Sequence, residues 1–551
     1  MTHSQIHGVR PRGRLRLHLA GALPVLGLIF ALLHGCPGCG GPQGPERPNV
    51  LWILWDTVRA DRLSLYGYEK PTTPFLEQWA RDALVFEDCV STANYTVPAH
   101  ASFFTGLLTS QHGAQNGRLY LDDEFTTIAE VLQSAGYRTY LYSANPHIAA
   151  EENFDQGFDL SEHPWDPKYR QAAYEIVSRK ISPQDQTSRL PEKIRRGQFG
   201  NWDIKASGEL AQRGLRDWLR VSDDERPFFA FLNYMEAHRP YIPAADYRAR
   251  MMSPDQVAQS YQINRGWVPQ WSYTFGLAEY SPEEIAITSA TYDATIAELD
   301  DLFADLIHAL EADGALENTI IILTSDHGEH LGEHHMLGHQ LSVYNPLIRV
   351  PLIIHYPERF APARDSRPVM NYDLVPTLLD LAGIEQRLAL AGGAVSLPSA
   401  PDSRVRVVES LGVFRDPMAA VKRAYPEWDP ATWDRELRAV ISGTDKLIWA
   451  SNGDHELYRY PDDAFESVNR IVEEPELAAS LAQTLADFLA DLGRQAGAGT
   501  EMPELPPEHL ERLRSLGYID IGGKPDTAAE ATEDENPPAR SSRGEETQGQ
   551  R

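Results

Sequence analysis

Two unbroken apolar runs, each leading into an acidic residue, stand out in the hydrophobic pattern of the chain. Residues 50–55 are Val-Leu-Trp-Ile-Leu-Trp and end at Asp56, and residues 320–323 are Ile-Ile-Ile-Leu and lead to Ser325 and Asp326. Apolar runs without polar alternation are typical of strands that are buried on both faces. We therefore expect two interior strands of a parallel sheet.

Helical periodicity fills much of the sequence between these runs. The clearest apolar stripe has spacings of three and four residues, typical of one helix face, and ends before Gly314, a helix stop signal; it consists of Ile296, Leu299, Leu302, Phe303, Leu306, Ile307 and Leu310. Strands that alternate with helices predict an α/β fold, a large and mostly parallel sheet sandwiched by helices. Functional residues collect at the carboxyl ends of such strands, where Asp56 and Asp326 stand.

Changes in pattern predict six segments along the 551 residues. They are a signal peptide (1–35), a Gly/Pro tether (36–46), the main α/β domain (47–384), a linker rich in small residues (385–403), a smaller C-terminal α+β subdomain (404–495) and a polar, mostly disordered tail (496–551). The subdomain is indicated by short β-like runs followed by a helical pattern over 475–492, and the tail by its Pro, Glu and Ser content.

The first segment has the composition of an export signal. A basic region to Arg16 precedes an apolar run over 17–33, which is short for a membrane span and suits a signal peptide. Leu33-His34-Gly35-Cys36 resembles a bacterial lipobox, although His34 is unusual there. We expect lipidation of Cys36, export, and anchoring at a membrane surface in the periplasm or on the cell surface of a bacterium. Ordinary cleavage and an uncleaved anchor are the alternatives.

Charge and cysteine content exclude several classes of function. The formal net charge of −29 repels nucleic acids and other anionic polymers, so we expect no nucleic-acid partner. Only Cys36, Cys39 and Cys89 are present, too few for a disulfide framework. We expect Cys89 to be buried as a small hydrophobic side chain.

Residues 96–106, T-V-P-A-H-A-S-F-F-T-G, resemble the nucleophile signature of the sulfatase family, C/S-x-P-x-R-A-S-x-x-T-G. Three further segments follow the family pattern in order: 47–61, 319–329, and 349–354 with 373–377. On this basis the chain is identified as a member of the sulfatase family, within the alkaline-phosphatase superfamily, from about Arg47 to about Asn469. The resemblance implies an ester hydrolase whose C-terminal subdomain is an antiparallel sheet with a helix.

Two central positions of the signature differ, because Thr96 replaces the Cys or Ser and His100 replaces the Arg. In sulfatases that Cys or Ser becomes a formylglycine, whose hydrate attacks sulfur. Thr96 cannot form that aldehyde, because its β-carbon already carries a methyl group. A threonine oxygen held on a metal can still attack phosphorus.

The resemblance also implies a site for one divalent metal. Its ligands would be Asp56, Thr96, Asp326 and His327, two carboxylates, one hydroxyl oxygen and one imidazole. The imidazole and the small number of carboxylates favour Mn²⁺ or Zn²⁺, with Ca²⁺ and Mg²⁺ as alternatives. The structural alternative makes Asp56 a cap and the Asp326-His327 pair a turn.

Three histidines complete the predicted catalytic set: His100, His238 and His339. His238 matches the family histidine that contacts the leaving-group oxygen or the transferred group, and His339 falls where sulfatases commonly have Lys. His100 would accept the proton of Thr96 or orient a phosphoryl oxygen. A purely structural role is the alternative for each of them. His334 and His335 are interpreted as loop histidines.

Together these features predict an exported, metal-dependent hydrolase of sulfate or phosphate-type esters, acting on a small anionic ester substrate through Thr96. One alternative is a transferase that moves a phospho-alcohol between envelope molecules. Its relatives usually carry several membrane spans, whereas this sequence has no such run after residue 35. A non-catalytic surface binding protein is the other alternative, which the intact Asp56, Thr96, Asp326 and His327 disfavour.

Overall fold

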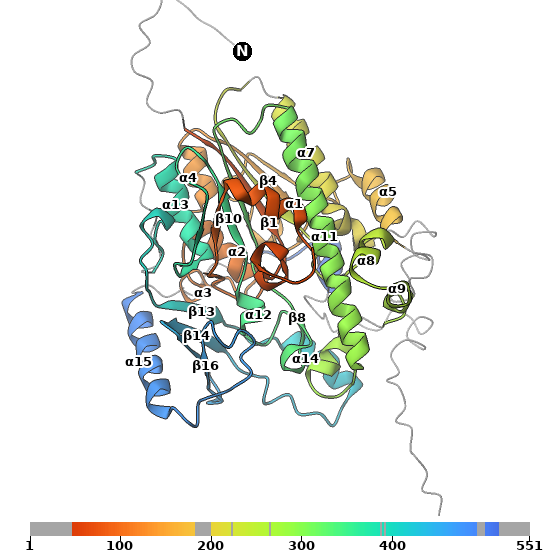
Figure 1. The fold of residues 1–551 in the computed structure, drawn as a ribbon, viewed down its shortest axis with the longest axis vertical. Coiled ribbons are helices and arrows are strands. Elements are labelled where there is room, and N and C mark those ends of the chain that lie inside the picture. Colours follow the sequence, from red (N-terminus) through yellow and green to blue (C-terminus); the bar gives the residue numbers. More distant parts are fainter. Residues whose placement is uncertain are drawn as a thin grey trace, which may run out of the picture. The chain divides into compact units, whose positions relative to one another are not determined.

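The molecule is built around a central sheet with helices on both faces (Figure 1). The computed structural model describes residues 47–181, 200–221, 224–263, 266–385, 388, 390, 393–492 and 502–516. In these residues the sheet has the order β11-β2-β10-β7-β1-β6-β4-β5. The strands are β11 (Ala363–Asp365), β2 (Leu84–Phe86), β10 (Leu352–His355), β7 (Thr319–Thr324), β1 (Asn49–Trp55), β6 (Phe228–Tyr234), β4 (Arg138–Ser143) and β5 (Leu160–Glu162).

The predicted mostly parallel sheet is confirmed. Strand β10 pairs antiparallel with both of its neighbours, and the other pairings in the sheet are parallel. Strands β1 and β7 lie side by side with Leu54 opposite Thr324, so Asp56 and Asp326 leave the sheet at the same edge.

Strand β1 is buried on both faces, as its apolar run predicts. Val50, Trp52 and Leu54 pack into one core cluster, and the residues between them pack into another. The first cluster lies under α2 (Thr96–Thr105), α4 (Ile128–Ser134) and α13 (Leu374–Leu381), and the second under α1 (Pro74–Trp79), α5 (Arg170–Lys180), α7 (Ser207–Val221) and α11 (Pro282–Ala312). Figure 1 shows α4 and α13 on one side of the sheet and α7 and α11 on the other.

Helix α11 confirms the predicted apolar stripe and is longer than that stripe. It starts with a capping box formed by Ser281 and Glu284, and Pro282 occupies its first turn. Its chain turns away at Gly314, which has a φ of 71°. Shorter helices of the main and C-terminal parts are α3 (Thr109–His112), α8 (Ala245–Met251), α9 (Pro254–Ser260), α10 (Trp267–Thr274), α12 (Asn345–Ile348) and α14 (Arg415–Ala424). Two small two-stranded sheets pair β3 (Cys89–Val90) with β12 (Val369–Met370), and β8 (His330–Leu331) with β9 (Leu337–Gly338).

The C-terminal part contains the expected antiparallel sheet and helix. The sheet runs β13 (Arg406–Ser410), β14 (Leu437–Ser442), β15 (Asp445–Ala450) and β16 (Glu456–Arg459), and α15 (Pro475–Asp491) packs against it. Its apolar residues share one cluster with Val90, Leu108 and Val343 of the main domain. The C-terminal sheet is therefore joined to the main domain by a continuous core.

Two segments that the sequence assigns to loose chain are packed where the structure describes them. In the expected linker, Leu397 is buried and its backbone N–H donates to Oγ1 of Thr377 at 2.9 Å. In the expected tail, α16 (Pro507–Ser515) is folded, and Leu513 and Leu516 near its end are buried. The predicted signal peptide and tether, and residues 517–551, lie outside the described residues.

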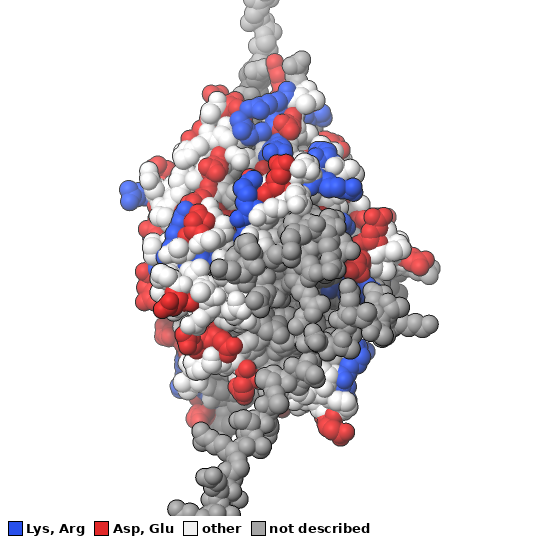
Figure 2. Space-filling view, turned by 90° about the vertical axis from the view of Figure 1, so that its right-hand side faces the viewer, with Lys and Arg blue, Asp and Glu red and all other residues white. Residues whose placement is uncertain are grey.

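The described surface carries both signs of charge. Figure 2 shows basic and acidic side chains interspersed over the coloured part of one face. None of the described helices is both long and apolar enough to cross a membrane. Cys89 is a buried free thiol, as expected.

Candidate active site

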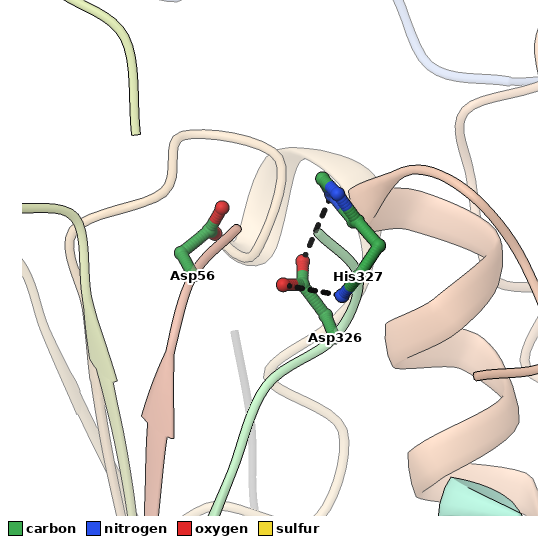
Figure 3. A group of neighbouring side chains, drawn as sticks. All are labelled: Asp56, Asp326 and His327. Atoms are coloured by element: carbon green, nitrogen blue, oxygen red, sulfur yellow. Dashed lines mark hydrogen bonds and ion pairs between the residues drawn. The ribbon is translucent and has the colours of Figure 1, made fainter. Parts of the chain in front are cut away.

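Three potential metal ligands meet at the carboxyl edge of the central sheet. Asp56 follows β1, and Asp326 and His327 follow β7; Figure 3 shows the three side chains together. Their candidate ligand atoms all lie within 4.8 Å of one another. The backbone N–H groups of Thr57 and His327 donate to Asp326 Oδ1 at 3.2 and 2.9 Å, which fixes that carboxylate.

The electrostatics of the two carboxylates favour a bound cation. Asp56 Oδ1 and Asp326 Oδ2 are buried, and neither has a hydrogen-bond partner among the described residues. Burial and the nearby charge of Asp326 raise the pKa of Asp56 to about 7, and burial raises the pKa of Asp326 to about 7. Two buried carboxylates with an orphaned oxygen each fit a divalent ion, which would supply the missing charge.

His327 has the tautomer that a metal ligand needs. Its Nδ1 donates to the carbonyl oxygen of Gly328 at 2.9 Å, which leaves Nε2 with its lone pair. Nε2 lies 3.3 Å from Asp326 Oδ2. Burial lowers the pKa of His327, so the ring is neutral near pH 7.

Thr96 lies beside these ligands at the first position of α2. Its Oγ1 is 3.5 Å from His327 Nε2 and 3.3 Å from Asn145 Nδ2. The side chain is buried, as is the whole of α2. The amino end of a helix favours negative charge, which suits a threonine oxygen that attacks an anionic ester.

His100 lies one helical turn after Thr96 and contacts its backbone. Nδ1 of His100 donates to the carbonyl oxygen of Thr96 at 2.9 Å, and Nε2 is 3.5 Å from Asn233 Nδ2. Burial lowers the pKa of His100 to about 3, and its ring packs against Phe103, Phe104 and Phe231. The contact is with the carbonyl oxygen of Thr96, so a role as base toward the hydroxyl stays a prediction.

His238 and His339 extend the site beyond the metal ligands. The His339 ring centroid is 4.6 Å from that of His327 and 5.2 Å from that of His238. His339 Nδ1 is 3.3 Å from Glu329 Oε2, while its buried Nε2 has no hydrogen-bond partner in the described chain. His238 Nδ1 donates to the carbonyl oxygen of Arg239 at 2.7 Å. The structure thus brings all the predicted site residues to one edge of the sheet.

The other histidines of the 330–339 segment have structural contacts. His330 is buried, and its Nε2 lies 2.7 Å from Ser342 Oγ. His334 stacks on Tyr344 at a ring distance of 3.8 Å, and His335 lies at the same distance from Tyr273. The contacts of His334 and His335 agree with their interpretation as loop histidines.

Sequence reasoning missed two asparagines that hold Asp56. Asn145 Nδ2 and Asn233 Nδ2 donate to Asp56 Oδ2 at 2.8 and 3.2 Å. Asn233 is near the end of β6, and Asn145 follows the end of β4. The available signal was the same as for Asp56, a polar side chain at the end of an apolar run.

A buried lysine, also missed, supports the turn that carries His238. Lys205 Nζ donates to the carbonyl oxygen of Met235 at 2.6 Å and to that of His238. Burial lowers the pKa of Lys205 to about 7. The sequence gives no sign of this role, because the contacts are with backbone atoms remote along the chain.

Comparisons with known proteins agree with this fold. A family profile described as Sulfatase matches residues 48–384, and one described as N-sulphoglucosamine sulphohydrolase, C-terminal, matches residues 332–493. The uncharacterized sulfatase YidJ of Escherichia coli (strain K12) is 24% identical over 452 residues, covering 80% of this chain and 86% of that protein. The multifunctional alkaline phosphatase superfamily protein PehA of Trinickia caryophylli is 27% identical over 375 residues, covering 58% of this chain and 70% of that protein.

A solved structure shares the fold. The phosphonate monoester hydrolase SpPMH from Silicibacter pomeroyi superposes with a TM-score of 0.60 at 21% sequence identity, covering 82% of this chain and 96% of that chain.

Proposed function

This chain belongs to the sulfatase family of ester hydrolases, and from that premise we propose that it cleaves phosphorus esters with Thr96 as the nucleophile. As a family member it is a hydrolase of sulfate or phosphate-type esters. The observation that carries the finer proposal is the position of Thr96 Oγ1, 3.5 Å from His327 Nε2 and beside the two orphaned carboxylates.

The methyl group of Thr96 is the reason for choosing phosphorus over sulfur. A formylglycine hydrate can shed a sulfate by collapsing to the aldehyde, and a threonine has no such route. A sulfated threonine would have to be cleaved by water directly. Water must displace threonine from phosphorus in the same way, so the choice of phosphorus rests on the loss of the aldehyde route that serves sulfate esters.

A divalent ion held by Asp56, Asp326, His327 and the Thr96 oxygen would lower the pKa of the Thr96 hydroxyl and offset the charge of an anionic ester. The ligand set contains an imidazole, which favours Mn²⁺ or Zn²⁺. Metal analysis of the purified protein after loading tests this assignment. A stoichiometry that does not fall in Asp326→Ala would contradict it.

In the first step the Thr96 oxygen, which has released its proton to solvent, forms a bond to phosphorus while the bond from phosphorus to the leaving oxygen breaks. In this proposal His339 protonates that leaving oxygen: burial lowers the pKa of His339, but Glu329 accepts from its Nδ1 and opposes that effect. His238 is the second candidate for the acid. In the second step water attacks phosphorus and gives a proton to the histidine that acted as the acid, and the bond to Thr96 breaks to return the deprotonated Thr96 oxygen.

A panel of chromogenic substrates tests the proposal. It comprises an aryl sulfate, a phosphate monoester, a phosphate diester and a phosphonate monoester, each assayed with Mn²⁺, Zn²⁺, Ca²⁺ and Mg²⁺. We expect at least one phosphorus ester to have a higher kcat/KM than the aryl sulfate. A clear preference for the aryl sulfate would overturn the proposal. Added alcohol that captures most of the product would instead indicate the transferase alternative.

We also propose that Cys36 is lipidated and that the protein is exported to a membrane surface. The basic region before residue 17, the short apolar run and the Leu-His-Gly-Cys sequence support this. Mass spectrometry of the mature amino terminus tests it. A free terminus at another residue would show that His34 prevents lipobox processing.

A further inference from the structure

A second group of metal-ligating side chains lies away from the candidate active site, where α16 meets the turn after β4. Glu151 and Glu152 belong to the short helix η4 (Ala150–Glu152), and His509 belongs to α16. Their candidate ligand atoms all lie within 4.8 Å of one another. His509 and Glu152 are 357 positions apart, so the fold alone brings them together.

His509 lies between the two carboxylates. Its Nε2 is 2.8 Å from Glu152 Oε1, and its Nδ1 is 3.7 Å from Glu151 Oε1. His147 approaches the same Glu152 oxygen, with its Nδ1 at 3.5 Å. A single ion takes only one nitrogen of the His509 ring, and the candidate ligand atoms of Glu151, Glu152 and His509, one from each residue, all lie within 4.8 Å of one another. Atoms that bind one ion at about 2.0–2.2 Å lie roughly 3–3.6 Å apart, so small side-chain rotations would bring the group to the spacing that a shared ion requires.

The ion pairs alone leave Glu152 incompletely satisfied. Glu152 is only 1% exposed, and its Oε2 has no hydrogen-bond partner among the residues that the structure describes. His147 and His509 are also buried, at 3% and 2% exposure. A buried carboxylate oxygen without a partner carries a desolvation penalty that a cation would remove.

We propose that Glu151, Glu152 and His509 bind a divalent transition metal, with His147 as a fourth ligand. Two imidazoles with two carboxylates match Zn²⁺ and related ions, whereas Ca²⁺ prefers oxygen ligands alone. The site is structural, because its ligands join two segments of the fold and three of the four are buried.

A metal here would stabilise the turn that carries Asn145. The backbone N–H of His147 donates to Asn145 Oδ1 at 3.0 Å, and Asn145 Nδ2 donates to Asp56 Oδ2 at 2.8 Å. The ion would therefore help to orient Asn145 from outside the active site. Leu513 and Leu516 are buried as well, so α16 has apolar contacts that do not depend on the ion.

Zinc titration of the untagged full chain tests the site, with bound metal measured by elemental analysis after gel filtration. The Asp326→Ala variant serves as the parent, because it removes the proposed catalytic metal and makes the result independent of the proposed function. We expect His509→Gln in this parent to lose one equivalent of Zn²⁺ and Glu151→Gln to weaken its binding at least about 10-fold. Glu511→Gln, on the same helix but outside the group, is the matched control and should retain that equivalent.

Circular dichroism confirms that each variant is folded, and zinc-edge anomalous diffraction locates the ion. Zinc density between Glu152 and His509 would support the proposal even if His509→Gln failed to fold. Equal zinc content in the parent and in folded His509→Gln, or no zinc density at this place in loaded crystals, would overturn it.

Discussion

At the scale of single residues, the proposed chemistry depends on where a few side-chain atoms point. The Thr96 Oγ1 atom faces His327, one of the candidate metal ligands, while His100 contacts the backbone carbonyl oxygen of Thr96. His327 and His238 both donate from Nδ1 to backbone carbonyls. His339 differs, because its Nδ1 faces the carboxylate of Glu329.

We predict that Thr96→Ala lowers kcat/KM by at least about three orders of magnitude, since the variant lacks the proposed nucleophile. Thr96→Ser keeps a hydroxyl at the same place and should retain part of the activity. Steady-state kinetics on the best phosphorus ester provide the measurement, with metal content determined for each variant. Full activity in Thr96→Ala would remove Thr96 from the mechanism.

We predict that His339→Ala slows esters with poor leaving groups far more than esters with good ones. A proton donor matters most when the departing oxygen is basic, and such catalysis is worth about 10²–10⁴-fold. Comparing kcat/KM for an alkyl and a nitrophenyl ester of the same acid measures this. His334→Ala is the control, and an equal loss on both esters would argue against His339 as the acid.

At the scale of elements, the sequence showed which segments form strands and helices better than it showed which of these elements lie side by side in the fold. The apolar runs predicted β1 and β7, and with them Asp56 and Asp326. Asn145 and Asn233 were missed because nothing in an apolar run shows that β6 lies beside β1 or that β4 lies beside β6. Pairing in a parallel sheet is set by the packing of helices over long separations, which one sequence does not display.

The turn after β1 is held to the segment after β8 by a buried ion-pair group. Arg59 is fully buried and contacts Asp61 and Glu333, with 2.8 Å between each pair of charged atoms. Burial opposes ionisation of Glu333, but the charges of Arg59 and His330, with hydrogen bonds from Arg59 and the backbone of Leu331, together outweigh it and hold the pKa of Glu333 well below its ordinary value of 4.5.

We predict that Glu333→Gln lowers the free energy of unfolding by about 1.5–3 kcal/mol at pH 7, the range for hydrogen bonds to charged groups. Because the folded-state pKa of Glu333 is lowered, its contribution is fully present above pH 4.5 and is lost as the pH falls through the folded value. Urea unfolding of both proteins between pH 7 and pH 3 measures this. The exposed Glu283→Gln is the control, and a difference independent of pH would contradict the prediction.

At the scale of the whole molecule, the two predicted folded regions are one structure. The buried Lys446 of β15 donates to the carbonyl oxygen of Val343 at 2.8 Å and pairs with Glu466. Sequence patterns predicted the fold class of both regions, a mostly parallel sheet and a smaller antiparallel sheet, but the shared core and the folded α16 follow from contacts between remote segments.

We predict that a chain ending at residue 403 does not fold independently, because it exposes the apolar face that β13–β16 cover. The full chain should unfold in one calorimetric transition, whereas the truncated chain should show none. The Asp326→Ala full-length protein is the control for loss of metal alone. A truncated protein with a native-like unfolding transition would show that the two regions are separable.

Gly328 directly follows the candidate ligands Asp326 and His327, and its close packing limits which substitutions the active site can accept. Its N–H donates to the carbonyl oxygen of Leu347 at 2.7 Å, and a β-carbon at this position would overlap the carbonyl oxygen of Pro346. Pro346 and Leu347 belong to α12, and Asn345 of the same helix accepts a hydrogen bond from Lys446 of β15. The loop that carries the candidate metal ligands therefore packs on a helix that the C-terminal sheet holds in place. The loop that carries Asp326 and His327 can change only together with α12 and the C-terminal sheet that holds it.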